Sequence, residues 1–269
     1  MSPDRFPADR LPADLVAALD HAATVPVLLV ASDFDGCLAP IVSRPEDARP
    51  LPESRAALLD AAALERTPVA VISGRALTDL ARLSGLGDSA ITLIGSHGSE
   101  FDTGFPQEIT AGHRDLLARI VGEFRSIAAD HPGVTVETKP VSTALHVRNA
   151  TADDAESALT RARRGPASWD GVEATEGKAV IELAVIETSK GIALDVLRER
   201  SGADVVIYLG DDVTDEKAFA HLRTGIDLSI KVGTGNTLAQ YRIDDPNAVA
   251  AVLAHVAARR AEALGTRSV

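Results

Sequence analysis

Cysteine is almost absent from this chain of 269 residues, which contains only Cys37. A single cysteine cannot form a disulfide within the chain, so a disulfide-stapled secreted domain is excluded and a reducing, cytoplasmic location is expected. Long apolar runs are also lacking, since no stretch reaches the roughly 18 apolar residues that a membrane-spanning helix needs. The first 25 residues mix acids and prolines with apolar positions and do not read as a secretory signal. We therefore expect a soluble cytoplasmic protein.

Runs of basic residues are missing as well. The chain has 39 acidic and 27 basic residues, and its formal net charge is −12. Such a charge repels a phosphate backbone or an anionic membrane, so neither a nucleic acid nor a membrane is an expected partner. The sequence has no internal repeat and no low-complexity tail, while 45% of its residues are hydrophobic. This composition allows a sizeable core in one large domain or two modest ones.

Short apolar runs without polar alternation are typical of strands that are buried on both faces of a parallel sheet. The chain has four such runs, at residues 26–32, 68–72, 90–95 and 204–210. Segments with helical patterns lie between or after them, at residues 53–66, 76–85, 189–202 and 215–222. An alanine-rich segment, 248–264, is expected to be a packing helix. Strands that alternate with helices predict an α/β fold with a parallel-sheet core.

The middle of the chain has a different pattern. Helical segments at 113–130 and 152–164 are interleaved with strand-like segments at 134–139, 143–149, about 169–175 and 178–185, the last following Glu176–Gly177. In these strands apolar and polar residues alternate, which predicts an antiparallel sheet with helices on one face and an open polar face. We therefore predict an α+β domain over residues 109–186, inserted into a core domain formed by residues 1–108 and 187–269.

The first apolar run leads directly into Asp33 and Asp35. Residues i and i+2 of an extended chain share a face, so these two carboxylates begin on the same side. At a separation of 5 to 6 Å and an effective dielectric near 20 they repel by roughly 3 kcal/mol. Protonation of one carboxylate, or a hard divalent cation with oxygen ligands, would offset this repulsion.

A second acidic cluster follows the last apolar run, with Asp211, Asp212 and Asp215. Ligands of open α/β sheets bind outside the carboxyl ends of the strands, so the two clusters are expected to meet in one crevice. Shared protons cannot neutralise four or five carboxylates at pH 7. A bound Mg²⁺, held by one or two carboxylates, a backbone carbonyl and water, is the simplest solution.

Donors for an anionic substrate occur at other strand and helix ends. Ser73 and Gly74 follow the run 68–72, and Lys190 begins the helical segment 189–202 in a chain with only five lysines. Each of these features alone is more often a turn or a helix cap. Together, a carboxylate nucleophile, a metal, a hydroxyl and an ammonium indicate phosphoryl transfer through an aspartyl-phosphate.

These residues resemble the four motifs of the haloacid-dehalogenase-like phosphohydrolases: DFDGC (33–37), Ser73, Lys190 and GDDVTD (210–215). The resemblance covers nearly the whole chain and implies a Rossmann-like core of that type with an inserted cap. It implies that Asp33 is the nucleophile and that Asp35 acts first as general acid and then as general base. Cys37 takes the last place of the first motif, where the superfamily has threonine or valine.

The same resemblance implies a ligand set. The Mg²⁺ ion would be bound by Asp33, the backbone carbonyl of Asp35 and Asp211, with Asp212 and Asp215 in support. Ser73, Gly74 and Lys190 would hold the phosphoryl oxygens, with Lys190 also counted among the catalytic residues.

Within this superfamily the chain is similar to the trehalose-6-phosphate phosphatase family. The matching stretches include residues 95–100, 136–148, 177–183 and 208–219. The similarity implies substrate contacts for Arg75, His97, Glu137, Lys139, Arg148 and Glu182, the last four in the cap against the glucose units. For His97 a second interpretation stays open, in which its side chain only caps its own loop. Where the family usually has an arginine two residues after the cap glutamate, this chain has Ala184.

The leading functional hypothesis is Mg²⁺-dependent hydrolysis of trehalose 6-phosphate in trehalose biosynthesis, with a functional link to a trehalose-6-phosphate synthase. A neighbouring hypothesis is a phosphatase for another sugar phosphate, such as sucrose or glucosylglycerol phosphate. A third, of a different class, is a non-catalytic sugar-phosphate sensor or a subunit of a synthase. The third hypothesis usually requires a lost nucleophile or lysine, and both Asp33 and Lys190 are present.

Overall fold

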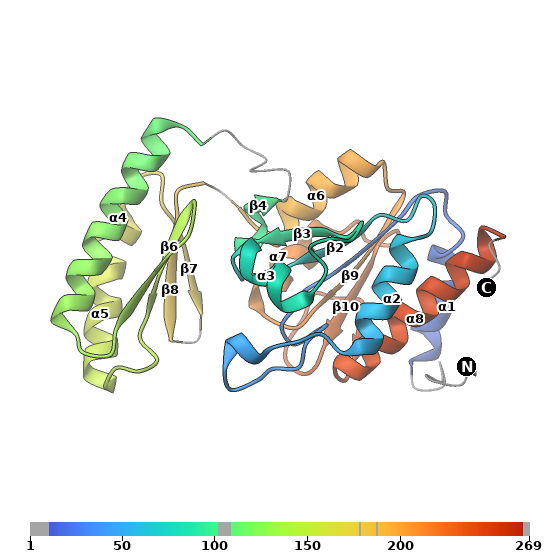
Figure 1. Cartoon of the computed structure of the whole chain (residues 1–269), viewed down its shortest axis with the longest axis horizontal. Helices are drawn as coiled ribbons and strands as arrows, with labels where there is room; N and C mark the ends of the chain where they lie inside the picture. Colours follow the sequence, from blue (N-terminus) through green and yellow to red (C-terminus); the bar gives the residue numbers. More distant parts are fainter. Residues whose placement is uncertain (1–10, 102–108, 178, 187, 266–269) are drawn as a thin grey trace. The chain divides into compact units, whose positions relative to one another are not determined.

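The computed structural model describes residues 11–101, 109–177, 179–186 and 188–265. The chain splits into two compact units, with Met1–Gly104 and Ser189–Val269 in the first and Phe105–Thr188 in the second (Figure 1). The second unit is thus inserted into the sequence of the first. In the described part of the chain, no helix is both long and apolar enough to cross a membrane.

A seven-stranded sheet forms the centre of the first unit, in the order β11-β10-β9-β1-β2-β3-β4. All neighbouring pairs are parallel except β3 and β4, which are antiparallel. The strands are β1 (Leu28–Ser32), β2 (Val69–Ile72), β3 (Thr92–Gly95), β4 (Glu100–Phe101), β9 (Val205–Gly210), β10 (Leu228–Val232) and β11 (Tyr241–Ile243). Because β1 lies between β9 and β2, the segments that follow β1 and β9 leave the sheet side by side.

Helices cover both faces of this sheet and bury alternate residues of its strands. One core packs Val30, Val71 and Ile207 against α1, α2, α3 and α8, and the other packs Leu29, Ile72 and their neighbours against α6 and α7. The helices are α1 (Ala13–Ala22), α2 (Pro52–Ala62), α3 (Leu77–Ser84), α6 (Lys190–Ser201), α7 (Val213–His221) and α8 (Pro246–Ala263), with short 3₁₀ helices η2 (Pro45–Asp47) and η3 (Ser96–Gly98). Strands buried on both faces need no polar alternation, which explains the continuous apolar runs.

The predicted α/β fold is confirmed. All four apolar runs form parallel strands of the sheet, and the predicted helical segments form α2, α3, α6, α7 and α8. Helix α3 ends, as its sequence indicates, at Gly85, whose left-handed backbone (φ +63°) suits glycine. The sequence patterns did not predict helix α1 or strands β4, β10 and β11.

The second unit is a four-stranded antiparallel sheet in the order β5-β6-β8-β7. Its strands are β5 (Thr135–Thr138), β6 (Ser142–His146), β7 (Glu173–Gly177) and β8 (Val180–Ala184), and its helices are α4 (Ala111–Asp130), α5 (Ala152–Arg164) and η4 (Pro166–Ser168). Phe124 of α4 and Ala158 of α5 belong to one apolar core with Leu145, Ile181 and Leu183 of the sheet. Helices therefore cover one face of the sheet, as the alternating pattern predicts.

One predicted strand in this unit was placed too early. We expected a strand near 169–175 that ends before Glu176–Gly177, but β7 begins at Glu173 and includes both of these residues. Gly177 pairs with Val180 of β8, and Ala179 has a left-handed backbone (φ +63°). The segment from Trp169 to Val172 instead follows η4 and links it to the sheet. We took Gly177 as a break between two strands, but a glycine can also lie within a strand, as it does here at the end of β7.

Candidate active site

The two acidic segments predicted from the sequence lie next to each other at the carboxyl edge of the sheet. Ser32 is in register with Leu209, and the backbone N–H of Asp33 donates a hydrogen bond of 2.9 Å to the carbonyl of Leu209. In the turn after β1, Gly36 has a left-handed backbone (φ +75°), and a Cβ atom built on it would lie 2.0 Å from Oδ2 of Asp211. The carboxylate of Asp211 therefore lies directly against the segment that begins with Asp33.

Lys190, the first residue of α6, joins the two acidic segments. Its Nζ atom lies 2.7 Å from Oδ2 of Asp33 and 2.8 Å from Oδ1 of Asp215, and its side chain is 1% exposed. Ser189 caps the helix, since its hydroxyl accepts the backbone N–H of Ile192. The Ser189 cap and the burial of the first turn of α6 fix the ammonium of Lys190 between the carboxylates of Asp33 and Asp215.

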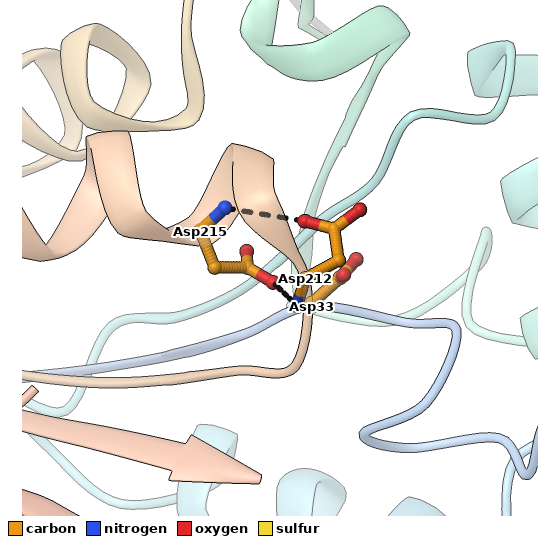
Figure 2. A group of neighbouring side chains, drawn as sticks. All are labelled: Asp33, Asp212 and Asp215. Carbon is orange, nitrogen blue, oxygen red and sulfur yellow. Dashed lines mark hydrogen bonds between the residues drawn. The ribbon is translucent and has the colours of Figure 1, made fainter. Parts of the chain in front are cut away.

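Asp215 uses both of its carboxylate oxygens within the protein. Its Oδ1 atom accepts from Lys190 and from the hydroxyl of Tyr208, at 2.8 and 2.7 Å. Its Oδ2 atom accepts the backbone N–H of Asp211 at 2.8 Å and that of Asp212 at 3.0 Å, the second of which is drawn in Figure 2. A carboxylate offers about four lone-pair positions, so these four bonds occupy Asp215. Asp215 is therefore an anchor that fixes the acidic loop.

Asp212 caps helix α7. Its Oδ1 atom accepts from the backbone N–H of Thr214 at 2.8 Å and from that of Asp215 at 3.2 Å, and the Asp212–Asp215 contacts are drawn in Figure 2. Against the opposing effect of burial, Lys190 and the hydrogen bonds from Thr214 lower the pKa of Asp212. Its carboxylate is therefore ionised and belongs to the negative charge of the site.

The site holds more acid than its cations balance. Burial, together with the neighbouring carboxylates of Asp215 and Asp212, raises the pKa of Asp211 to about 7. Burial also raises the pKa of Asp33, although Lys190 attracts its charged form. Despite burial, the pKa of Lys190 is well above its ordinary range, because Asp215 and Asp33 lie beside it. Lys190 contacts two of the four carboxylates, those of Asp33 and Asp215, and the remaining negative charge favours a further cation.

The residues present fit a metal ion. Asp33, Asp212 and Asp215 each offer a carboxylate oxygen, and these oxygens lie within 4.8 Å of one another. Carboxylate oxygens are the ligands of hard divalent cations. Because Asp215 is occupied by hydrogen bonds, Asp33 and Asp212 are the members of this group best able to bind an ion, and the carboxylate of Asp211 lies against the segment that begins with Asp33. This acidic group can hold a metal.

Asp35 is held in a different way. The Nε and Nη2 atoms of Arg75 lie 2.7 and 2.6 Å from its two carboxylate oxygens, which is a bidentate ion pair. The guanidinium also lies 5.5 Å above the ring centre of Phe34, and the backbone N–H of Arg75 donates to Oγ of Ser73 at 3.2 Å. Arg75, predicted as a substrate contact, thus contacts the predicted general acid in this structure.

The loop after β3 closes this side of the site. The backbone N–H groups of Ser96 and His97 donate to the carbonyls of Arg75 and Ser73, at 2.7 and 2.9 Å. A Cβ atom on Gly74 would lie 2.4 Å from Cε1 of His97, so the imidazole packs on the Gly74 backbone. Ser96 and His97 both have left-handed backbones (φ +48° and +55°), a strain that concentrates at functional sites. His97 therefore lies beside the predicted phosphate loop.

The predicted sugar contacts lie in the second unit, on the polar face of its sheet. Glu137 and Glu182 both pair with Ala144 across β6, and therefore share a face. The ammonium of Lys139 lies 3.0 and 2.9 Å from the two carboxylate oxygens of Glu182. The hydroxyl of Ser142 donates to the same carboxylate at 2.7 Å. Lys139, which is buried, and Glu182, which is partly buried, thus form a preorganised ion pair.

The other two predicted cap residues are more exposed. Oε2 of Glu137 lies 2.9 Å from Nε2 of His146, and both side chains are more than 40% exposed. Arg148 follows β6 and is exposed. These charged groups belong to the open polar face that the alternating pattern predicts.

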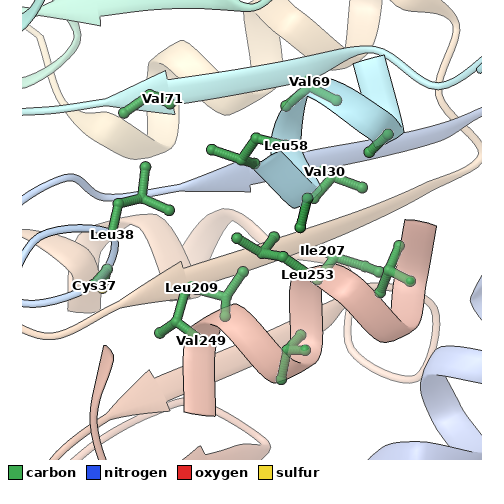
Figure 3. Close-up of a cluster of buried hydrophobic side chains, with 14 of the residues drawn as sticks. Val30, Cys37, Leu38, Leu58, Val69, Val71, Ile207, Leu209, Val249 and Leu253 are labelled. Carbon is green, nitrogen blue, oxygen red and sulfur yellow. The ribbon is translucent and has the colours of Figure 1, made fainter. Parts of the chain in front are cut away.

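Cys37 is fully buried next to the site. It belongs to the core that also contains Leu38, Val30 and Leu209 (Figure 3). Burial, with the negative charge of Asp33, raises the pKa of the thiol well above its ordinary range. Cys37 is therefore a neutral packing residue, a role that a small side chain in the last place of the motif can fill.

Three residues of the site were not predicted from the sequence. Tyr208 supports Asp215, Glu100 accepts the backbone N–H of Leu77 at 2.6 Å at the start of α3, and Lys231 donates to the backbone carbonyl of Asp211. Each acts on a loop of the site through a partner that only the fold brings close. Lys231 lies near the carboxyl end of β10, where ligands of such sheets bind, so the sequence could have identified it if β10 had been recognised as a strand.

Comparisons with known proteins agree with these motifs. The trehalose-phosphatase family model matches residues 31–247. A trehalose-phosphate phosphatase of Mycolicibacterium paratuberculosis is 36% identical over 231 residues, which are 80% of this chain and 58% of that protein. The chain thus spans a little under three fifths of this relative's length.

Two solved structures are similar to this chain over most of its length. A trehalose-6-phosphate phosphatase related protein is 28% identical with a TM-score of 0.69, covering 86% of this chain and 97% of that one. The C-terminal domain of C. albicans trehalose-6-phosphate phosphatase has a TM-score of 0.74 at 22% identity, covering 92% and 99%, and it shows the shared fold. Because the family model matches residues 31–247, which are most of this chain, the chain belongs to the trehalose-phosphatase family.

Proposed function

We propose that this chain hydrolyses trehalose 6-phosphate to trehalose and phosphate, as a Mg²⁺-dependent phosphoric monoester hydrolase. The observation that carries the proposal is the contact between Asp33 and Lys190, 2.7 Å apart at the carboxyl edge of the sheet. A buried carboxylate beside an ammonium can attack phosphorus while the ammonium holds a phosphoryl oxygen. Family membership, and the trehalose-phosphate phosphatase activity for which its relatives are named, support this substrate.

In the first step, a carboxylate oxygen of Asp33 attacks the phosphorus atom and the bond from phosphorus to the sugar oxygen breaks. Asp35, released from Arg75 and protonated from solvent before the step, gives this proton to the departing sugar oxygen. In the second step, Asp35 takes a proton from water as the water oxygen attacks the aspartyl-phosphate. Phosphate leaves, and the Asp33 carboxylate is restored.

Lys190, Ser73 and the backbone of Gly74 hold phosphoryl oxygens in this proposal. Asp33, the backbone carbonyl of Asp35 and Asp211 would hold Mg²⁺, with Asp212 and Asp215 in support: the carboxylate of Asp212 would also face the ion, and Asp215 fixes the loop. The bound ion neutralises negative charge on the phosphoryl group and on the carboxylates.

The second unit, within residues 109–186, serves as the cap that selects the sugar. Lys139 donates to sugar hydroxyls, and Glu137 and Glu182 accept from them. Arg148 is assigned to the same surface, and Arg75 and His97 to the substrate side of the core. A cytoplasmic location and a functional link to a trehalose-6-phosphate synthase complete the proposal.

A second candidate is a phosphatase for another sugar phosphate, such as sucrose or glucosylglycerol phosphate. Ala184 favours it, because this residue ends β8 where the family usually has an arginine. The missing guanidinium removes five possible donors near the sugar-binding surface.

A substrate panel tests both candidates. Phosphate release is measured from trehalose 6-phosphate, sucrose 6-phosphate, glucosylglycerol phosphate and glucose 6-phosphate, each with Mg²⁺ and with a chelator. The proposal predicts the largest kcat/KM for trehalose 6-phosphate and loss of turnover with the chelator. A larger value for another sugar phosphate supports the second candidate. Binding of trehalose 6-phosphate without phosphate release would indicate a sensor instead.

A further inference from the structure

A second buried lysine lies beside the acidic cluster. Lys231 is in β10, in register with Gly210 of β9, so its side chain starts next to the residues that precede Asp211. The side chain is 5% exposed. Its ammonium donates a hydrogen bond to the backbone carbonyl of Asp211.

This hydrogen bond completes the support of one peptide group. The carbonyl of Asp211 and the N–H of Asp212 belong to the same planar peptide unit. Lys231 holds the carbonyl, and Oδ2 of Asp215 accepts the N–H at 3.0 Å. Since both ends of the unit are held, its plane cannot rotate, and the side chains of Asp211 and Asp212 leave it in fixed directions.

Glu216 compensates the charge of Lys231. Its Oε1 atom lies 3.8 Å from the Lys231 ammonium. Its Oε2 atom accepts from the backbone N–H of Leu238 at 2.8 Å and from the hydroxyl of Thr237 at 3.3 Å. A buried ammonium needs such partners, because taking it out of water is costly. Lys231 is thereby tied to α7 and to the loop between β10 and β11.

We propose that Lys231 is a positioning residue for cation binding. This proposal rests on the proposed function only in taking Asp211 and Asp212 as the carboxylates that face the ion. By fixing the peptide between them, Lys231 presets their carboxylates for an ion shared with Asp33. Partners that orient metal ligands typically contribute 10- to 100-fold to metal affinity.

The direction in which cation affinity changes on loss of the Lys231 ammonium distinguishes a positioning role from a purely electrostatic one. A cation repels a nearby ammonium, so loss of the Lys231 charge alone would strengthen Mg²⁺ binding. Loss of positioning weakens it. The proposal therefore predicts weaker cation binding after the charge is removed.

The test is Lys231→Met, which keeps most of the side-chain volume but has no donor and no charge. Mn²⁺ alone is titrated by electron paramagnetic resonance, and Mg²⁺ is titrated in a phosphate-release assay at saturating sugar phosphate. We expect the dissociation constant of Mn²⁺ and the half-saturating Mg²⁺ concentration to rise by about 10-fold or more. The KM for the sugar phosphate at saturating Mg²⁺ should change by less than about 3-fold.

Two further variants complete the design. Lys217→Met removes an exposed lysine of α7 and should leave Mn²⁺ binding unchanged. Lys231→Arg keeps the charge and donors and should retain affinity within about 5-fold, since only the geometry of the donor changes. If circular dichroism shows that Lys231→Met does not fold, Lys231→Gln is measured in its place and the same rise is expected.

Unchanged or tighter Mn²⁺ binding in a folded, neutral variant at position 231 overturns the proposal. The direct Mn²⁺ titration needs no turnover. If the wild-type chain releases no phosphate but its Mn²⁺ affinity still falls on substitution, the proposed function fails and the positioning role stands.

Discussion

The ammonium of Lys190 lies 2.7 Å from Oδ2 of Asp33, although one residue starts α6 and the other follows β1. The same ammonium contacts Asp215, which in turn holds the backbone of Asp211 and Asp212. One cation thus connects the predicted nucleophile to the loop of the predicted metal ligands. This network lies at the carboxyl ends of two central strands, where a substitution at either end is expected to affect the chemistry.

Asp33→Asn should abolish turnover while the fold is kept. The amide is similar in size but cannot attack phosphorus, so we expect kcat to fall by on the order of 10⁴-fold or more. Phosphate release and a thermal melt are measured on the same preparation. As a control, Asp79→Asn removes a carboxylate that is 53% exposed on α3, and activity should stay near the wild-type level. Substantial turnover by Asp33→Asn would remove Asp33 as nucleophile.

Asp35→Asn should make the rate depend more strongly on the leaving group. A general acid matters most when the departing oxygen is basic, so the loss of kcat/KM should be about 10²-fold or more for phenyl phosphate and much smaller for 2,4-dinitrophenyl phosphate. The slope of log kcat/KM against leaving-group pKa, over a series of aryl phosphates, measures this effect. An equal loss for every ester would show that Asp35 does not protonate the leaving group.

The fold could be predicted where the sequence pattern follows from burial alone. Residues 28–32 form β1 in the middle of the sheet, and all five are buried, so no polar alternation was needed. Strand β10 was missed because its apolar residues alternate with Ser229 and Lys231. The hydroxyl of Ser229 accepts the N–H of Gln240 at 2.9 Å, and Lys231 donates to Asp211. These polar residues are buried because distant partners satisfy them, which no local pattern reveals.

The candidate site could be predicted as a set of residues, because carboxylates at two strand ends must meet at one edge of the sheet. The hydrogen-bond partners that hold each carboxylate could not be predicted. Asp215 is occupied by four hydrogen bonds, and Asp35 is paired with Arg75, which follows a different strand. Such pairings depend on side-chain directions that only tertiary packing sets.

Stability of the metal-free protein should fall with rising pH because of Asp211. In the unfolded chain this carboxyl loses its proton near pH 3.8, and in the folded chain it keeps the proton up to about pH 7. Between these values the folded state binds more protons, so this group stabilises the fold at low pH and the contribution is lost as pH rises through about 7. Thermal melts with a chelator at pH 5 and pH 8 measure the effect, and Mg²⁺ should stabilise more at pH 8.

The variant Asp211→Asn isolates the contribution of the Asp211 carboxyl to the pH dependence of stability from those of all other titrating groups. The amide is neutral at every pH, so the metal-free variant should gain stability relative to wild type between pH 5 and pH 8, and Mg²⁺ should stabilise it less. Asp88→Asn, at an exposed position before β3, should show no such gain. A wild-type protein and an Asp211→Asn variant with parallel pH profiles would contradict a raised pKa for Asp211.

Arg260 should be the basic residue whose loss destabilises the fold most clearly without acting on the site. This residue of α8 is 1% exposed, and its guanidinium donates to the hydroxyl of Thr67 and to the backbone carbonyls of Ala23, Val25, Pro26 and Arg66. Arg260→Met leaves several of these acceptors buried without a donor, which should cost about 3 kcal/mol or more in urea unfolding. Arg259→Met removes the neighbouring, 44% exposed arginine and should cost less than about 1 kcal/mol. Equal losses for the two variants would show that the buried bonds of Arg260 add no more stability than a surface ion pair.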